Sequence, residues 1–320
     1  MRAALTILTA ILLSILTGCE AGGRKLLTVD FQPGQTLRYK FVSSRDIEIN
    51  WSFPAGGTKK PENKVDKLHE SMEMIVAYIP VGPECDGLTT VKATCESVKV
   101  ERKQRGGTAD VVESLPGKSF TITVSPTGKM EDSSQLNELI REIGEKTFRQ
   151  GGSGGRIKNP DMIGDFVTTQ WFLWDAVASI KKPLEGVSVG RHWMSKLSVP
   201  TPMVSRLARD VTYTLKEIRQ TEKGELAVIK SSYSLAESVP SSWPILYTGS
   251  FQMSGTFGFL TRYKFLDLQG EGQELFNIDA GRTEQYNQQY QLNAEASVPF
   301  GIEAGAGIKI KQNLTMQLLE

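Results

Sequence analysis

The sequence has few of the residues on which metal and acid–base chemistry most often depend. It contains two histidines, His69 and His192, and three cysteines among 320 residues. They form none of the common zinc-binding spacings, such as Cys-x-x-Cys or His-x-His. Neither histidine is accompanied by the strand-to-helix turn that presents a catalytic serine, so a surface or strand-end position is favoured for both. We therefore expect no metal site, no cofactor and no catalytic histidine.

The sequence also lacks an excess of charge of either sign, since 37 Lys and Arg residues nearly balance 36 Asp and Glu residues. A neutral chain has no electrostatic footprint for nucleic acid, so we expect no nucleic-acid partner. Carboxylates remain as catalytic candidates, and Glu131-Asp132 or Asp161 with Asp165 could form an acid/base pair. Asp161 is better explained by a helix start and Asp165 by the polar face of the same helix, which makes an enzyme the least favoured class.

An apolar run near the N-terminus is too short to cross a membrane. It follows Arg2 and extends without charge from Ala3 to Leu16. This is the length of a signal-peptide core rather than the roughly 20 residues of a membrane span. The run ends in Leu16-Thr17-Gly18-Cys19, which resembles the lipobox of bacterial lipoproteins.

The resemblance implies that Cys19 is lipidated and becomes the first residue of the mature protein. In such proteins the thiol takes a diacylglyceryl group, a dedicated peptidase cuts before the cysteine, and the new amine can take a third chain. Two or three acyl chains give stable anchoring, whereas one gives only marginal binding. We expect residues 1–18 to be a signal peptide and the body to lie in the cell envelope, outside the cytoplasm, held to a bacterial membrane through Cys19. The alternative is an ordinary cleaved leader that ends near a cysteine.

The remaining chain divides into four segments by composition and periodicity. Residues 19–28 form a short polar tether, and structure is expected to begin near Val29. A β-rich half covers 29–131, a helical segment covers 132–183, and a second β-rich half covers 184–320.

Apolar and polar residues alternate over much of both β-rich halves, which is typical of half-buried strands. Odd positions are apolar from Leu37 to Phe53 except near 43–45, and an exposed loop is expected over Pro54–Asp66. A hairpin follows, with strands around 72–78 and 91–95 and a bulge at Glu96-Ser97, where the apolar parity changes. Even positions from Tyr286 to Leu318 are mostly apolar or small. Strands of this length imply long, curved antiparallel sheets.

Two cysteines lie in this hairpin, and their pairing is open. An oxidising compartment favours a disulfide between Cys85 and Cys95. However, seven extended steps of about 3.3 Å place Cys95 roughly 23 Å from the turn, whereas bridged Cα atoms lie within about 7 Å. Separate thiols, with Cys95 in the core, are the favoured alternative.

The centre of the chain changes to helical spacing. Apolar residues predict one helix over Ser133–Phe148 and a second over Pro160–Ile180. Gly151-Gly152-Ser153-Gly154-Gly155 joins them and lacks the following Lys-Ser or Lys-Thr of a phosphate-binding loop, so it indicates a flexible linker.

The predicted fold class is α+β and mostly β, with long curved antiparallel sheets from two halves around a central helical segment. Residues between Met74 and Val91 recur between Val211 and Val228 at one constant spacing, which suggests that the halves are duplicated. The body also resembles uncharacterised β-rich lipoprotein families whose strand-rich halves flank helices.

The consecutive large residues Trp171-Phe172-Leu173-Trp174 project from more than one face of the predicted helix, so one packing surface does not bury them all. Trp171, Phe172 and Trp174 are therefore candidates for binding an apolar ligand. Alternatively, two sheet halves enclose this helix and all four residues are ordinary core. We favour an envelope lipoprotein that binds an apolar ligand or lipid. The next alternative is a scaffold lipoprotein whose partner is an envelope protein, and the last is a carboxylate-based enzyme.

Overall fold

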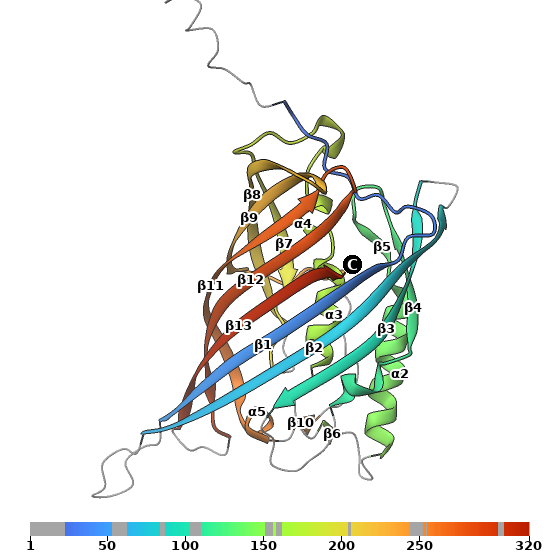
Figure 1. Ribbon diagram of the computed structural model, residues 1–320. Coiled ribbons are helices and arrows are strands. Elements are labelled where there is room, and N and C mark those ends of the chain that lie inside the picture. Colours follow the sequence, from blue (N-terminus) through green and yellow to red (C-terminus); the bar gives the residue numbers. More distant parts are fainter. Residues whose placement is uncertain are drawn as a thin grey trace, which may run out of the picture.

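One curved antiparallel sheet of 11 strands makes up most of the structure (Figure 1). The computed structural model describes residues 23–52, 63–83, 87–102, 110–150, 156–157, 162–203, 206–243, 252–253, 255–299 and 304–319. The sheet and its few helices confirm the predicted α+β, mostly β class. Within these ranges no helix is long and apolar enough to cross a membrane.

The strands of the large sheet follow one another along the chain as β1 (Leu37–Ser52), β2 (Asn63–Pro83), β3 (Thr89–Arg102), β4 (Ser119–Val124), β5 (Met130–Asp132), β7 (His192–Ser198), β8 (Ala208–Thr221), β9 (Gly224–Leu235), β11 (Thr261–Asn277), β12 (Arg282–Ser297) and β13 (Gly305–Leu319). A separate pair consists of β6 (Arg156–Ile157) and β10 (Gln252–Met253). The helical elements are η1 (Val111–Ser114), α2 (Ser134–Gln150), α3 (Ile163–Phe172), α4 (Asp175–Ala178), η2 (Pro183–Glu185) and α5 (Gly255–Phe259).

The sheet order is β5-β4-β3-β2-β1-β13-β12-β11-β9-β8-β7, so the last strand of the chain pairs with the first. This central pairing extends from Arg38 opposite Leu319 to Ser52 opposite Gly305. Strands of both predicted halves therefore belong to one sheet. The duplication of the halves stays a prediction.

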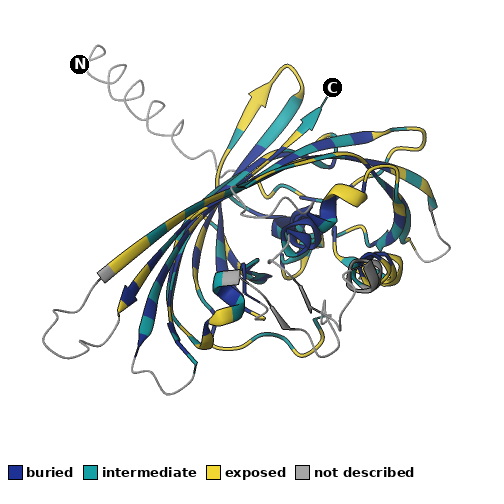
Figure 2. Ribbon diagram, turned by 90° about the horizontal axis from the view of Figure 1, so that it is seen from below, coloured by how far each residue is buried: buried dark blue, intermediate teal, exposed yellow. Residues whose placement is uncertain are grey.

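Strand register places apolar side chains on the concave face of the sheet. Ile47 lies opposite Ile310, and both are buried. The adjacent pair, Glu48 opposite Lys309, points to the other face because successive side chains of a strand alternate. Figure 2 shows helices on the inner side of the arc, where they cover part of this apolar surface.

The predicted hairpin and its bulge are confirmed. Ile75 is paired with Ser97 and Val76 with Cys95, which leaves Glu96 as the extra residue on β3. Cys95 is buried with a free thiol, and Cys85 lies outside the described residues. Burial raises the pKa of the Cys95 thiol to about 11.

The loop predicted over Pro54–Asp66 is too long at its C-terminal end, because β2 already begins at Asn63. Ile49 pairs with Asp66, and Trp51 pairs with Lys64 and donates from its indole N–H to Asp66 at 2.8 Å. Backbone pairing with β1 therefore extends the strand through polar residues. Alternation does not reveal such a strand end.

The predicted helix Ser133–Phe148 is confirmed as α2, whereas the helix predicted over Pro160–Ile180 is wrong in its continuity. It consists of α3 and α4, and the chain breaks at Leu173 and Trp174. The residues 151–155 of the predicted linker lie outside the described part of the chain.

The body begins earlier than the predicted start near Val29. Lys25 forms a backbone bridge with Val187, and its ammonium group lies 2.6 Å from a carboxylate oxygen of Glu225. Leu27 is fully buried. Lys25 and Leu27 therefore belong to the folded body rather than to the predicted tether.

Candidate ligand-binding site

The helical segment with the predicted ligand residues packs against the concave face of the sheet (Figure 2). Trp174 is buried, and its ring meets that of Tyr78 on β2 edge-on at a centroid distance of 6.4 Å. Phe172 is also buried, but its ring lies 6.1 Å from that of Tyr286 on β12. Trp171 is partly buried. Phe172 and Trp174 thus contact different strands, and a binding role for each of the three stays a prediction.

The break between α3 and α4 redirects the chain across the sheet. Trp174 has φ 61° and ψ 9°, a left-handed conformation that continues no right-handed helix. Beyond it, the indole N–H of Trp193 on β7 donates to the carbonyl of Ala176 at 2.6 Å. The Tyr213 hydroxyl on β8 donates to the carboxylate of Asp175. Hence α3 lies on the central strands, while α4 lies on β7 and β8.

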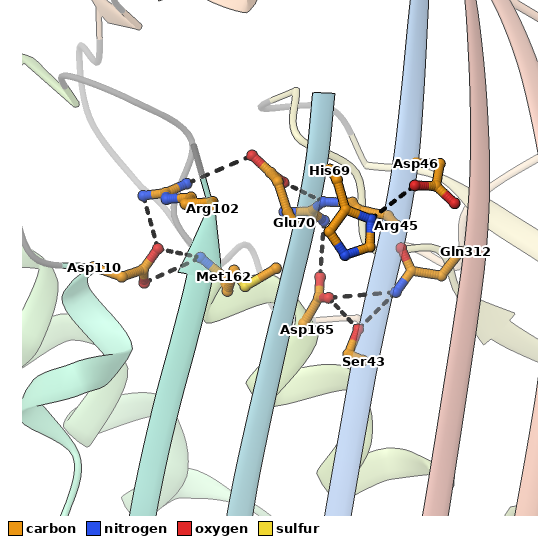
Figure 3. A network of polar contacts seen from close by, with 10 residues as sticks. All are labelled: Ser43, Arg45, Asp46, His69, Glu70, Arg102, Asp110, Met162, Asp165 and Gln312. Carbon is orange, nitrogen blue, oxygen red and sulfur yellow. Dashed lines mark hydrogen bonds and ion pairs between the residues drawn. The ribbon is translucent and has the colours of Figure 1, made fainter. Parts of the chain in front are cut away.

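A buried arginine on β1 connects α3 to the sheet (Figure 3). The Arg45 side chain is 1% exposed and donates through Nε to Glu70 at 2.6 Å and through Nη1 to Asp165 of α3 at 3.1 Å. Asp165 also accepts a 2.5 Å hydrogen bond from the Ser43 hydroxyl, which in turn accepts one from the Gln312 amide at 2.6 Å. Burial lowers the pKa of Arg45, but Asp165 and Glu70 raise it by more, so this guanidinium is charged and compensated.

The same network continues to the start of α3. Arg102 lies 3.8 Å from Glu70 and 2.8 Å from Asp110. Asp110 accepts from the backbone N–H of Met162 at 3.3 Å and caps η1 through the N–H of Val112 at 3.1 Å. Burial raises the pKa of Asp110, while Arg102 and these N–H groups oppose the rise. The network therefore joins β1, β2, β3 and η1 to α3.

Asp165 differs from its interpretation as a residue on the polar face of a helix. It is 3% exposed because the face of α3 that carries it points at Arg45 rather than at solvent. Its suggested acid/base partner, Asp161, lies outside the described residues. The alternative pair, Glu131-Asp132, is exposed.

A second buried arginine, Arg209 on β8, has very different surroundings. It is 0% exposed, and its Cζ lies 4.4, 4.8 and 5.2 Å from the ring centroids of Tyr233, Tyr290 and Phe172. Nη2 donates to Gln288 at 2.5 Å, whereas Nε and Nη1 have no hydrogen-bond partner. None of the described carboxylates lies within 4.0 Å of this guanidinium. Arg209 is therefore a buried cation without a contacting anion.

Further buried polar atoms without partners lie in the row of strands between the two arginines. Arg45 pairs with Gln312 across β1 and β13, and Gln312 pairs with Tyr290 across β13 and β12. Arg45 Nη2, Gln312 Oε1 and the Tyr290 hydroxyl are all buried without a hydrogen bond. Buried polar groups almost always have a partner. The concave face thus has buried hydrogen-bonding atoms that the protein itself does not use.

Two buried carboxyl groups lie on the same face. Burial raises the pKa of Asp175 to about 6, although hydrogen bonds from Tyr213 and Ser195 lower it. Burial likewise raises the pKa of Glu274 to about 7, although the Thr283 hydroxyl donates to it at 2.7 Å. Both groups consequently change charge near neutral pH.

The two histidines lie apart from this face. The His69 ring is exposed and 2.7 Å from Asp46, and the His192 ring is 2.7 Å from the Thr214 hydroxyl at the strand end. In the part of the chain that the structure describes, no group of three or more His, Cys, Asp or Glu side chains could hold a metal ion.

Sequence reasoning missed the buried polar residues, although a signal for them exists. Arg45, Gln288 and Gln312 occupy positions where the strand pattern calls for apolar side chains. Each interrupts an otherwise apolar stripe, and each is at most 5% exposed. A polar interruption in a buried stripe therefore marks this site better than the aromatic run does.

No family model and no curated protein matches the sequence. Among solved structures, one of lipovitellin concerned with lipid–protein interactions aligns with 91% of this chain and 26% of its own length, at 13% identity and a TM-score of 0.39. Our chain thus spans about a quarter of the lipovitellin chain. A crystal structure of Pseudomonas aeruginosa OpdQ aligns at 8% identity, with 88% of this chain and 98% of its own, and a TM-score of 0.14. Scores this low carry no argument about fold or function.

Proposed function

We propose that this protein is a membrane-anchored envelope lipoprotein whose body binds an apolar, lipid-like ligand against the concave face of the sheet. The supporting observation is a mismatch between that face and its helical cover. β1 has 16 residues and, at about 3.3 Å per residue, is roughly 50 Å long. α3 has 10 residues and is roughly 15 Å long. The helix α3 is therefore long enough to cover only part of the apolar face of the sheet.

The apolar surface continues past α3 toward the end of β1. Ile49, Trp51, Ala306 and Ile308 are each at most 8% exposed there. Described elements near this end include α5 and the two-residue strands β6 and β10 (Figure 1). Short segments can separate from a sheet at lower cost than a packed helix layer, because they bury fewer contacts. An apolar ligand would enter at this end.

Anchoring through Cys19 is the second part of the proposal. Lys25 is held by Val187 and Glu225, so six residue steps of at most about 3.6 Å separate it from the lipid. The body would then lie within roughly 20 Å of the membrane. A Cys19→Ala variant should accumulate as an uncut precursor without acyl labelling. Normal processing with retention at the membrane would contradict the lipobox interpretation.

Ligand binding is tested by filling the proposed space. Ala306→Phe adds a ring on the concave face, and Lys309→Phe is a matched control because position 309 faces the opposite side. We expect Ala306→Phe alone to weaken saturable binding of a fluorescent fatty-acid probe while the protein stays folded. If the face is completely packed, Ala306→Phe should instead destabilise the protein by about 1–3 kcal/mol through overpacking. That result, with no saturable binding by the unmodified protein, would leave the scaffold function in front.

A further inference from the structure

Arg209 has a charge that its contacts do not neutralise. Burying an ion without a partner is unfavourable, because water no longer solvates it. Arg45 shows how this chain meets that cost elsewhere, with carboxylate oxygens at 2.6 and 3.1 Å. Arg209 has only the neutral amide oxygen of Gln288. Arg209 therefore has no contacting anion among the described residues, although its charge lowers the pKa of the nearby buried Asp175.

The three rings around Arg209 stabilise the buried cation but provide no hydrogen-bond acceptor for Nε and Nη1. The faces of Phe172, Tyr233 and Tyr290 attract a cation, each by an amount that falls well below an ion pair. They accept no hydrogen bond from Nε or Nη1 in this arrangement. The guanidinium is thus held in place with two nitrogen donors free.

The Tyr290 hydroxyl is a third hydrogen-bond donor, in addition to Nε and Nη1 of Arg209. This hydroxyl is buried without a hydrogen bond, and the Tyr290 ring lies against Arg209. Burial raises the pKa of Tyr290 far above the neutral range, so the hydroxyl keeps its proton and can donate. Nearby glycines leave room for these side chains, because a Cβ on Gly270 would lie 2.5 Å from Tyr290 Cβ and one on Gly272 would lie 2.2 Å from the Tyr233 hydroxyl.

We propose that Arg209 and Tyr290 bind a monoanionic head group, of which a carboxylate is the simplest, on the apolar ligand. The head group supplies the contacting negative charge that Arg209 lacks, and its oxygens accept from Nε, Nη1 and the Tyr290 hydroxyl. Phe172, whose ring centroid lies 5.2 Å from Arg209 Cζ, would then contact the apolar part of the ligand next to its head group. This inference rests on the proposed function and specifies its ligand as an amphipathic anion.

The test uses the purified full chain with two probes that differ only in the head group. Dansylaminoundecanoic acid carries a carboxylate, and its methyl ester does not. We expect the acid to bind at least about ten-fold more tightly than the ester, because hydrogen bonds to charged groups contribute more than neutral ones. Arg209→Gln should remove this preference, because the acid loses far more affinity than the ester does.

Tyr290→Phe is the second variant, since it removes one hydroxyl and keeps the ring. We expect it to weaken binding of the acid about three-fold or more and binding of the ester by less, because hydrogen bonds to a charged group contribute more. Circular dichroism checks that each variant is folded, and if Arg209→Gln is not, Tyr290→Phe decides.

The outcomes separate the two proposals. Equal, saturable binding of acid and ester would overturn the head-group inference and keep the apolar site. Water would then occupy the position beside Arg209 and Tyr290. Saturable binding of neither probe would overturn both. Mass spectrometry of lipids extracted with the membrane-purified protein distinguishes a carboxylate from a phosphodiester, and exclusively neutral lipids would contradict the inference.

Discussion

Trp174, the left-handed residue between α3 and α4, is a position where we expect glycine to be more stabilising than alanine. Trp174 is 1% exposed, so replacing it with Ala should cost about 3–5 kcal/mol of unfolding free energy. At φ 61°, an L-residue pays roughly 1–2 kcal/mol that glycine does not pay. Glycine loses about 0.4–1 kcal/mol through its greater freedom in the unfolded chain. Trp174→Gly should therefore be more stable than Trp174→Ala, by about 1 kcal/mol.

Phe172 provides the matched control. It lies at the end of α3 in the ordinary helical region, so Phe172→Gly should be less stable than Phe172→Ala, by up to about 1 kcal/mol. The order of Gly and Ala is thus expected to reverse between two positions that are two residues apart. Urea unfolding followed by far-UV circular dichroism measures all four variants by linear extrapolation.

The same order at both positions would refute the reasoning and restore one continuous helix over Pro160–Ile180. The absolute cost of Trp174→Ala answers a second question. Its ring meets Phe31 at 5.0 Å and Tyr78 at 6.4 Å, and a cost within 3–5 kcal/mol identifies it as core. A much smaller cost together with weaker probe binding would place Trp174 in the wall of the ligand site.

Three further predictions concern the concave face and its contacts. Because burial raises the pKa of Glu274 from 4.5 to about 7, its stabilising contribution is complete below pH 4.5 and is lost as pH rises through 7. The unfolding free energy of the unmodified protein should therefore fall by up to about 3 kcal/mol more than that of Glu274→Gln between pH 4 and 8, and parallel urea-derived curves would count against this. Gly128→Ala would place a Cβ 2.8 Å from Trp174 Cβ at φ +82°, so it should cost about 1–3 kcal/mol more than Gly34→Ala, where φ is +79° and nothing lies within 4 Å. Thermal unfolding that shows equal losses for both would deny the close contact. Asp165→Asn should lose on the order of 3 kcal/mol in chemical unfolding, because it leaves Arg45 with one carboxylate. Glu96→Gln, at the solvent-exposed ion pair with Arg38, should leave the unfolding midpoint almost unchanged.

Side-chain period made the strands of this protein predictable, because a half-buried strand must alternate wherever one face meets a core. It located the bulge at Glu96 for the same reason, since one extra residue reverses the alternation. The spacing of apolar residues could not locate the helix break at Trp174. That break depends on contacts with β7 and β8, which lie far along the chain.

The buried polar residues of the concave face were not predictable as a group, for a related reason. Arg45, Tyr290 and Gln312 are 22 to 267 residues apart in sequence, and only strand pairing places them side by side. One polar residue in an apolar stripe resembles ordinary variation. Several that align across neighbouring strands form a site, and that alignment needs the register.

The two buried arginines finally differ in what their removal should do. Arg45→Met would leave Asp165 buried without its cation and Glu70 with only Arg102 at 3.8 Å, so it should destabilise the protein by about 3–5 kcal/mol. Arg209→Met removes a cation that has no contacting anion and puts an apolar chain among three rings. Replacing a poorly compensated buried charge with an apolar side chain is often neutral or stabilising. In the ligand-free protein, Arg209→Met should therefore unfold at the same or higher urea concentration than the unmodified chain, while it loses the preference for the acid probe. A loss of stability as large as that of Arg45→Met would instead mean that Arg209 is a structural residue, and its charge would then need a partner within the protein.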